Sequence, residues 1–264
     1  VEFFIWNANP VLASLGPITV HWYGALFALA ILSGLQVLKW CYTQERIAVE
    51  SLDDLLMYAV FGIVVGARLA HCLFYDPSYY FSHPLKILAI WEGGLASHGG
   101  GLGVIIAGYF YQKKHKMSFI WLLDRLAIST ALFGFFVRMG NFINSEIIGI
   151  PTNVPWAVVF SRIDNLPRHP AQLYEALSYL TIFCLLFAAY RFSKIKHYSG
   201  GLLGAFLVLV FTARFLIETV KIKQAAYGSD SIFSTGQLLS IPFFVVGLVL
   251  IFRAYSLSNR SVEK

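Results

Sequence analysis

The chain has 264 residues, of which 58% are hydrophobic and only 13% are charged, and its mean hydropathy is +0.67. An average globular domain carries about 25% charged residues, so the composition excludes an ordinary soluble domain, while the abundance of aromatic and aliphatic residues excludes a disordered chain. The formal net charge of +6 is accounted for by membrane topology and attraction to anionic lipid, so no nucleic-acid partner is expected.

Apolar segments recur along the chain at the length that a bilayer requires, about 20 residues per helix. We therefore predict an all-α membrane protein, with a single integral membrane domain over residues 1–264 and seven transmembrane helices. Their predicted ranges are 17–39, 53–75, 94–112, 118–138, 171–191, 200–221 and 235–254. No basic segment with a cleavage site precedes the first apolar run, so we expect the first helix to remain in the mature protein.

The connections differ in their content of lysine and arginine. Eleven of these residues follow the first, third, fifth and seventh predicted helices, and five lie on the opposite side. The positive-inside rule then places the N-terminus outside and the C-terminus in the cytoplasm. The longest connection, 139–170, is rich in glycine and proline and is predicted to form a small extracytoplasmic cap, with a weak strand pattern at 156–160.

Several charged residues lie inside or at the edges of apolar segments. They are Arg68, Asp124, Arg125, Arg138, Arg214 and Glu218. Charge in hydrocarbon is costly unless it is paired or hydrated, so such residues usually face a cavity and mark a site. A buried ion pair that only fixes helix packing is the alternative, and for Asp124 and Arg125 both interpretations remain open. Arg214 and Glu218 stand at i and i+4, so they can pair with each other or share a ligand.

A stretch of small and amide residues follows Arg138 and is typical of neither a helix nor a strand. It contains Gly140, Asn141, Asn144 and Glu146. Guanidinium forks and amide donors suit a phosphate group. An apolar substrate that carries a phosphate, namely a phospholipid, is therefore expected.

Other polar groups are predicted to meet Arg138 at the outer face. His98 lies in a glycine-rich run at 91–101, where glycines let the backbone approach a ligand but are equally compatible with close helix packing. His21 and Tyr23 open the first predicted helix, and residues 168–175 open the fifth. Convergence from several segments favours a site over scattered packing. His98 has no partner at metal-ligand spacing, so neither a metal nor a cofactor is expected.

Six motifs along the chain resemble those of the prolipoprotein diacylglyceryl transferase family. They are HWYG at 21–24, WEGGLASHGGGLGV at 91–104, RMGNFINSEIIG at 138–149, RHPAQLYEA at 168–176, RFLIE at 214–218 and GQLLSIP at 236–242. The resemblance implies a multi-pass enzyme of the bacterial inner membrane that carries out the first step of lipoprotein maturation. The diacylglyceryl group of phosphatidylglycerol would move to the lipobox cysteine thiol in the signal peptide of a preprolipoprotein, forming a thioether and releasing glycerol phosphate. The active site would face the extracytoplasmic side.

The resemblance also implies residue roles. Arg138 and Arg214 would hold and neutralise the phosphate, with Asn141 adding amide contacts and with Glu146 and Glu218 orienting the guanidinium groups. Because a thiol of pKa about 8.5 must lose its proton, a base is needed; His98 is the first choice and His21 the second. Tyr23 would position the headgroup, Gly99 and Gly100 would border the substrate, and Asp124 and Glu175 would support the site.

The chain departs from the family pattern in places. Ser145 stands where glycine is common, Val137 precedes Arg138 where glycine is usual, and ETVKIKQ at 218–224 lacks the Arg-Glu-Pro-Asp that often follows the glutamate. The last departure puts the outer end of the sixth predicted helix in question.

Two other functions compete with the transferase. A transporter or channel would line its pathway with Arg68, Arg125, Arg214 and Glu218, but no repeated half-pattern supports it. A phospholipid hydrolase or phosphatase would use the same phosphate contacts and differ only in its acceptor, which would be water rather than a thiol.

Overall fold

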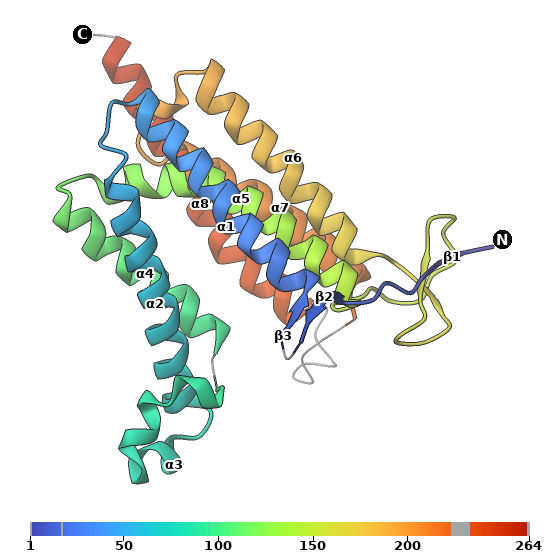
Figure 1. Cartoon of the computed structure of the whole chain (residues 1–264). Helices are drawn as coiled ribbons and strands as arrows, with labels where there is room; N and C mark the ends of the chain where they lie inside the picture. The colour runs from blue at the N-terminus through green and yellow to red at the C-terminus, as the bar shows by residue number, and fades with distance from the viewer. Residues whose placement is uncertain (1, 17, 95, 223–232, 263–264) are drawn as a thin grey trace. The chain divides into compact units, whose positions relative to one another are not determined.

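The computed structural model describes residues 2–16, 18–94, 96–222 and 233–262, and it is mainly helical (Figure 1). Among these residues, six helices are long and apolar enough to cross a membrane, which indicates a multi-pass membrane protein. They span Trp22–Gln44, Ser51–Phe74, Phe119–Asn144, Ala171–Phe192, Gly201–Val220 and Thr235–Ser256. The contacts of the chain form two compact units, residues 1–38 with 123–264, and residues 39–122.

The predicted third crossing is a helix, α4 (Ser97–Lys114), but it is not among the six. Five glycines in this helix lower its hydropathy. The seventh crossing and the orientation of the termini therefore stay predictions.

Two predicted boundaries differ from the structure. The first helix, α1 (Trp22–Gln44), begins after residue 17 because β2 (Val11–Leu15) and β3 (Ile18–His21) form an antiparallel hairpin before it. The fourth predicted helix, α5 (Phe119–Asn144), continues through residues 139–144, which the sequence had placed in the cap. Its polar final turn is tolerated because the side chains there have tertiary partners, as described below.

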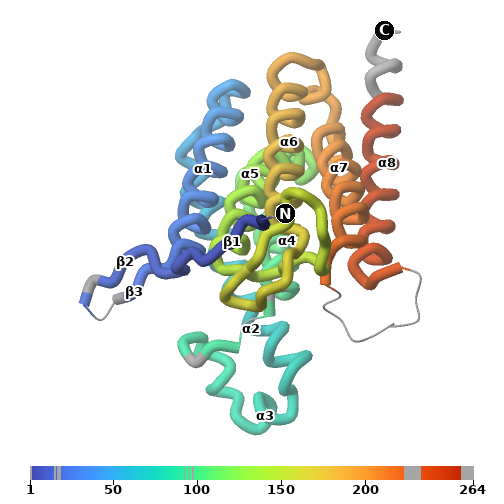
Figure 2. The backbone as a smooth tube through the Cα atoms, turned by 90° about the vertical axis from the view of Figure 1, so that its right-hand side faces the viewer, coloured from blue at the N-terminus to red at the C-terminus, as the bar shows by residue number. Residues whose placement is uncertain are grey.

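The remaining helices agree with their predicted ranges to within a few residues, except that α8 continues to Val262 instead of ending at residue 254. They are α2 (Ser51–Phe74), α6 (Ala171–Phe192), α7 (Gly201–Ile217), which continues into the 3₁₀ turn η4 (Glu218–Val220), and α8 (Thr235–Val262). In the first unit α6, α7 and α8 lie side by side (Figure 2). A Cβ atom at Gly204 of α7 would lie 2.8 Å from the Gly247 carbonyl oxygen of α8, so glycine permits this close approach of two backbones.

A small sheet joins segments that are far apart in the sequence. β1 (Phe4–Trp6) pairs in parallel with β4 (Val158–Phe160), which pairs antiparallel with β5 (Pro167–Arg168). The strand pattern at 156–160 is thus present over three residues. Phe142 and Phe160 belong to the apolar core beneath the sheet, and Trp6 Nε1 donates a hydrogen bond to the Phe142 carbonyl at 3.0 Å. The sheet is therefore attached to the end of α5.

The second unit is a tightly packed pair of helices, α2 and α4. Cβ atoms added at Gly66 or Gly103 would overlap backbone atoms of the facing helix. Within the glycine run, a Cβ atom at Gly99 would overlap the Gly66 carbonyl oxygen, so close helix packing accounts for this glycine. The short segments α3 (Pro77–Ser82), η1 (Pro84–Leu88) and η2 (Ile90–Glu92) connect the two helices.

Candidate functional site

Charged side chains from three elements of the first unit form one network. Arg138 near the end of α5 forms an ion pair with Glu175 of α6, with 2.9 Å between Nε and Oε2. Lys221, just after η4, donates to the other oxygen of Glu175 at 3.1 Å. The same ammonium lies 3.4 Å from Oε2 of Glu218. The Glu175 side chain is only 6% exposed, and two cations compensate its charge, as a buried carboxylate requires.

Amide side chains extend this network along the end of α5. Arg138 Nη1 donates to Asn141 Oδ1 at 3.1 Å, and Asn141 Nδ2 donates to Glu146 Oε2 at 3.0 Å. Asn144 donates to the other Glu146 oxygen at 3.1 Å, and Gln172 Nε2 donates to the Glu146 backbone carbonyl at 2.6 Å. Glu146 therefore acts on Arg138 through Asn141, whereas Glu175 contacts the guanidinium directly. The predicted role of Glu146 in orienting a guanidinium stays a prediction, with Asn141 as the link between the two side chains.

The turn that ends α5 explains one departure from the family pattern. Ser145 N donates to the Phe142 carbonyl and Glu146 N to the Asn141 carbonyl, the two hydrogen bonds of a Schellman motif. Ser145 is left-handed, with φ at 57°. Glycine adopts this conformation without the cost of about 1 to 2 kcal/mol that a side chain brings. The motif places the Glu146 carboxylate where the side-chain amides of Asn141 and Asn144 can donate to it.

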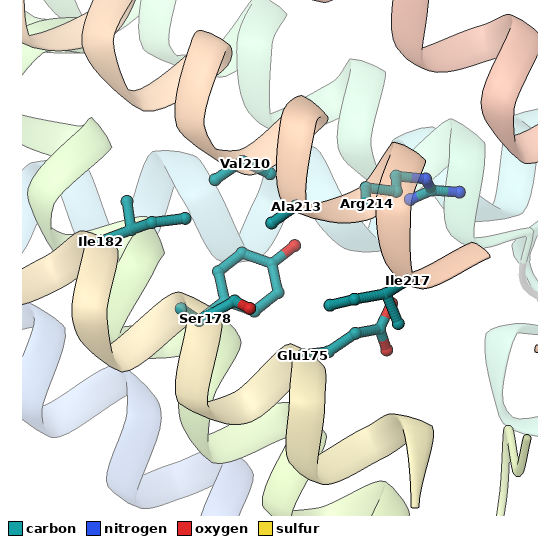
Figure 3. Close-up of a pocket in the computed structure, with 8 residues that line it drawn as sticks. Glu175, Ser178, Ile182, Val210, Ala213, Arg214 and Ile217 are labelled. Atoms are coloured by element: carbon teal, nitrogen blue, oxygen red, sulfur yellow. The ribbon is translucent and has the colours of Figure 1, made fainter. Parts of the chain in front are cut away.

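Arg214 lies apart from these pairs, in a pocket between α6 and α7. Figure 3 shows Glu175, Ser178 and Ile182 on α6 facing side chains of α7. The cavity volume of this pocket is about 10 Å³, far below the roughly 300 to 1,000 Å³ of typical ligand sites. In the described part of the chain, no ion pair or hydrogen bond of the Arg214 guanidinium is recorded. Arg214 is thus a cation that remains available for a ligand.

The predicted alternative that Arg214 and Glu218 pair with each other is not what the structure shows. Glu218 caps α7 at the point where the helix tightens into η4, and its carboxylate pairs with Lys221. A Cβ atom at Gly236 of α8 would overlap the same carboxylate. Glu218 therefore positions Lys221 and packs on α8, and its predicted role in orienting a guanidinium stays a prediction.

His21 and Tyr23, the two predicted site residues at the start of α1, have different surroundings. The Tyr23 ring packs on α5, because a Cβ atom at Gly140 would lie 2.8 Å from its Cδ2. This contact places Tyr23 next to the turn that carries Asn141. His21 ends β3 opposite Val11 of the hairpin and is exposed. Within the described residues, no contact of the His21 side chain with the Arg138 network is recorded.

His98, Gly99 and Gly100 belong to the second unit and form the first turn of α4. His98 is exposed, whereas Gly99 is buried against α2, where a Cβ atom would overlap Ala70. Gly99 is thus accounted for by packing. A Cβ atom at Gly100 would make only ordinary van der Waals contacts, with Ile63 and Ala67 of α2.

Arg68 fixes the segment that leads to His98. Its side chain is buried and donates to four backbone carbonyls, those of Lys86, Ile87, Gly93 and Gly94. The guanidinium also lies over the Tyr80 ring, 5.1 Å from its centre. Since nearly all its donors are used on the backbone, Arg68 clamps this connection. A transporter pathway lined by Arg68 loses its support.

Asp124 has a structural role at the other end of α5. Its carboxylate accepts from the backbone N–H groups of Gly200 and Leu203, both at 2.8 Å, and the residue is 1% exposed. These N–H groups open α7, so Asp124 caps a neighbouring helix. Arg125 donates to the Lys196 carbonyl at 3.1 Å. Of the two interpretations, helix packing accounts for both residues.

Gly149 holds the backbone at Lys221 in place through an isolated antiparallel bridge. Gly149 N donates to the His169 carbonyl at 3.0 Å, and Ile150 N donates to the Val220 carbonyl at 2.9 Å. A Cβ atom at Gly149 would lie 2.5 Å from the His169 oxygen and 2.7 Å from that of Val220. Only glycine fits between these two carbonyls. The backbone on either side of it therefore sets the position from which Lys221 reaches Glu175.

Arg168 of β5 closes the loop before it. Its guanidinium donates to both carboxylate oxygens of Asp164 and to the Gly149 carbonyl. These hydrogen bonds hold the pKa of the Asp164 carboxyl below its ordinary value of 3.8. Arg168 thus has a structural role in holding this loop.

Residues 10–253 match the family model described as prolipoprotein diacylglyceryl transferase. The chain belongs to this family. It is 58% identical over 246 residues to the phosphatidylglycerol–prolipoprotein diacylglyceryl transferase of Tolumonas auensis, covering 93% of the chain and 95% of the relative. It is 46% identical to the protein of the same name from Chloroherpeton thalassium over 264 residues, covering 100% of the chain and 98% of the relative. The Nitrosomonas europaea protein of that name is 40% identical, with 94% and 90% covered.

Sequence reasoning found most of the charged residues in the Arg138 network of this chain but missed several of their partners. Lys221 was counted only as a charge in a connection, although its i+3 spacing from Glu218 could have indicated the pair. Gln172 and Gly149 carry no signal by themselves, because their roles depend on contacts with distant segments. The departure at 218–224 still supplies a cation at Lys221; residue 223 and residue 224 lie outside the described residues.

Proposed function

We propose that this chain transfers the diacylglyceryl group of phosphatidylglycerol to the lipobox cysteine thiol of a preprolipoprotein. The observation that carries the proposal is a fixed guanidinium, that of Arg138, in a network that also reaches, through Glu175, the pocket of Arg214, which has no ion pair within the described residues. Two such cations suit a phosphate that gains charge as it leaves. Membership of a transferase family and the names of its relatives support the same reaction. No metal or cofactor is required.

The chemical step places three demands on the site. The thiol loses its proton to a base, the thiolate attacks a glyceryl carbon, and the carbon–oxygen bond to the phosphate breaks, so that a thioether forms and glycerol phosphate leaves. Charge develops on the departing phosphate oxygen. Positively charged donors that are fixed in advance stabilise that charge without reorganising during the reaction.

Arg138 and Arg214 meet the last demand in different ways. Glu175 and Asn141 hold Arg138, so its orientation is set before substrate arrives. Arg214 has no such partner in the part of the chain that the structure describes, and it is proposed to close on the phosphate. Asn141 adds an amide contact, and Glu146 holds that amide in place. Tyr23, packed on Gly140, is proposed to position the headgroup.

His98 is proposed as the base, with His21 as the second choice, and Gly99 and Gly100 are proposed to border the substrate. Glu218 supports the site through Lys221. Replacing His98 with Gln should lower the transfer rate more than the affinity for phosphatidylglycerol. The same substitution at His21 is the matched control. Full activity of His98→Gln together with a loss at His21 would reverse the assignment.

The topology is part of the proposal. We propose that both units belong to one integral membrane domain in the bacterial inner membrane, with α4 as a seventh crossing, the N-terminus outside and the C-terminus in the cytoplasm. The segment 139–170 would form the extracytoplasmic cap, and the active site would face that side. The uneven distribution of lysine and arginine supports this orientation.

The decisive experiment incubates the purified protein with phosphatidylglycerol and a lipobox peptide and measures the peptide by mass spectrometry. A diacylglyceryl adduct that requires the peptide cysteine is the expected result, and a peptide with serine in its place is the control. Release of glycerol phosphate without an adduct would instead indicate a hydrolase. Intact lipid with folded protein would contradict both.

A further inference from the structure

A second cavity lies at the other end of the first unit, where α6 ends and α7 begins. It is an open cavity of about 290 Å³ between the α6–α7 connection and the last turns of α8. Figure 1 shows that α6 runs from the small sheet to this end. The cavity therefore lies about one helix length from Glu175, which sits in the first turns of α6, and it is separate from the pocket of Arg214.

The lining of this cavity is polar at one end and apolar at the other. Lys194 and Tyr198 come from the α6–α7 connection, outside the membrane-spanning helices. Ile251, Ala254 and Tyr255 come from α8, within its candidate membrane span. A ligand that fills it must carry a polar group at the membrane boundary and an apolar chain beside the helix, which is the construction of a lipid.

The charge at this end has one sign. Arg191, Lys194, Lys196 and Arg253 all lie within 189–202 and 248–256, and these two segments contain no aspartate or glutamate. Asp124 reaches this region, but its two oxygens accept the N–H groups that open α7. At the opposite end, by contrast, Arg138, Lys221 and Arg168 each have a carboxylate partner.

Among these cations, Lys194 is the one that lines the cavity. The Lys196 ammonium lies over the Tyr190 ring, 5.4 Å from its centre, and the Arg191 guanidinium lies over the Phe192 ring at 5.6 Å. Lys194 is exposed, and in the described residues no ion pair of its ammonium is recorded. An exposed ammonium at the mouth of an apolar cavity is complementary to a phosphate attached to acyl chains.

We propose that this cavity binds an anionic phospholipid, with the phosphate at Lys194 and an acyl chain along α8 between Ile251 and Tyr255. Basic pockets between membrane helices bind anionic headgroups in this way, and each lysine near an anionic membrane surface favours binding by about fivefold. The site is separate from the proposed active site and does not depend on the transferase reaction. The lipid bound here is not consumed.

The test counts lipids bound to the purified full chain by native mass spectrometry, with dioleoyl phosphatidylserine as the anionic probe and dioleoyl phosphatidylcholine as the zwitterionic one. Lys194→Gln should weaken one phosphatidylserine-binding event about fivefold, while Lys194→Arg should retain it. Phosphatidylcholine binding should be equal in all proteins. Transfer from phosphatidylglycerol in detergent should be unchanged by Lys194→Gln.

Arg191→Gln is the matched control, because it removes the same charge three residues away without touching the lining. Equal losses in Arg191→Gln and Lys194→Gln would mean diffuse attraction to the surface and would overturn the proposal. So would a Lys194→Gln protein that binds phosphatidylserine as well as the parent. Since lipid is counted without any reaction, a failed transfer assay would leave this result intact.

Discussion

The two ends of α5 both carry buried charge and use it in opposite ways. At its start, the Asp124 carboxylate accepts two backbone N–H groups of α7. At its end, Arg138 contacts the side chains of Glu175 and Asn141, which are themselves held by other side chains. Backbone partners belong to the fold and cannot leave. Side-chain partners can reorient, so the second arrangement can admit a substrate phosphate and the first cannot.

The two ends of α5 show what distinguishes a structural charge from a functional one in an apolar helix. Asp124 is 1% exposed and Arg138 is 17% exposed, but a charge within an apolar helix is costly at both ends, so cost does not distinguish a structural residue from a functional one. The identity of the partner distinguishes the two kinds of residue. Asp124 satisfies helix N–H groups that would otherwise be orphaned, whereas Arg138 lies in a network whose neighbour Arg214 has no recorded protein partner within the described residues.

The largest expected effect is on the transfer rate and comes from Arg138, near the C-terminal end of α5. Arg138→Gln should lower the transfer rate by about 1,000-fold, because the guanidinium that we propose neutralises the leaving phosphate is lost. The melting temperature should change little, since Lys221 still compensates Glu175. Rates from the lipobox-peptide assay and thermal unfolding in detergent measure the two effects. Unfolding of the variant would place Arg138 in the same class as Asp124.

Asp124→Ala should show the reverse pattern. Two buried N–H groups lose their acceptor, so the free energy of unfolding should fall by about 2 to 3 kcal/mol. The rate per folded molecule should stay within about twofold of the parent. Denaturation in mixed micelles, with activity normalised to folded protein, tests both. A large rate loss in stable protein would contradict the structural assignment.

A smaller effect is expected at the centre of the network. Lys221→Met leaves Glu175 and Glu218 with less compensation, so Arg138 should be held less firmly and the rate should fall about tenfold. Lys221→Arg, which keeps the charge, is the control and should retain most of the activity. Equal activity in both variants would show that Arg138 needs only Glu175 and Asn141.

The smallest effect concerns Asp164 beside the small sheet. Its folded-state pKa is lowered by Arg168, so the pair stabilises the folded protein above pH 3.8. That contribution is lost as the pH falls through the lower folded-state pKa. The melting temperature should therefore drop more steeply below pH 4 in the parent than in Asp164→Asn. Parallel curves would show that the exposed pair contributes nothing measurable.

Much of the fold could be predicted from the sequence, because apolar length alone identifies membrane helices. All seven predicted segments are helical, and six meet the length and hydropathy of a membrane span. The hairpin before α1 and the last turn of α5 could not be predicted. The first depends on pairing between Val11 and His21, and the second on tertiary partners for Asn141.

The network around Arg138 could be predicted only in part, because sequence reasoning finds partners that are close in the chain more readily than distant ones. Arg138, Asn141 and Glu146 are close in the chain, and the structure joins them in one series of hydrogen bonds. Glu175 was given only a supporting place, yet it contacts Arg138 directly. Thirty-seven residues separate these two in the sequence, and no local pattern links a position on α5 to one on α6.

The sequence by itself determined that the chain is a membrane protein of this family, because apolar length and motif order are properties of the chain alone. Only the tertiary structure decided which buried charge serves packing and which is available for chemistry. Asp124, Arg68 and Arg138 look alike in sequence as charges within apolar helices. Their partners lie on other elements, and folding sets those partners by bringing distant backbone and side chains together.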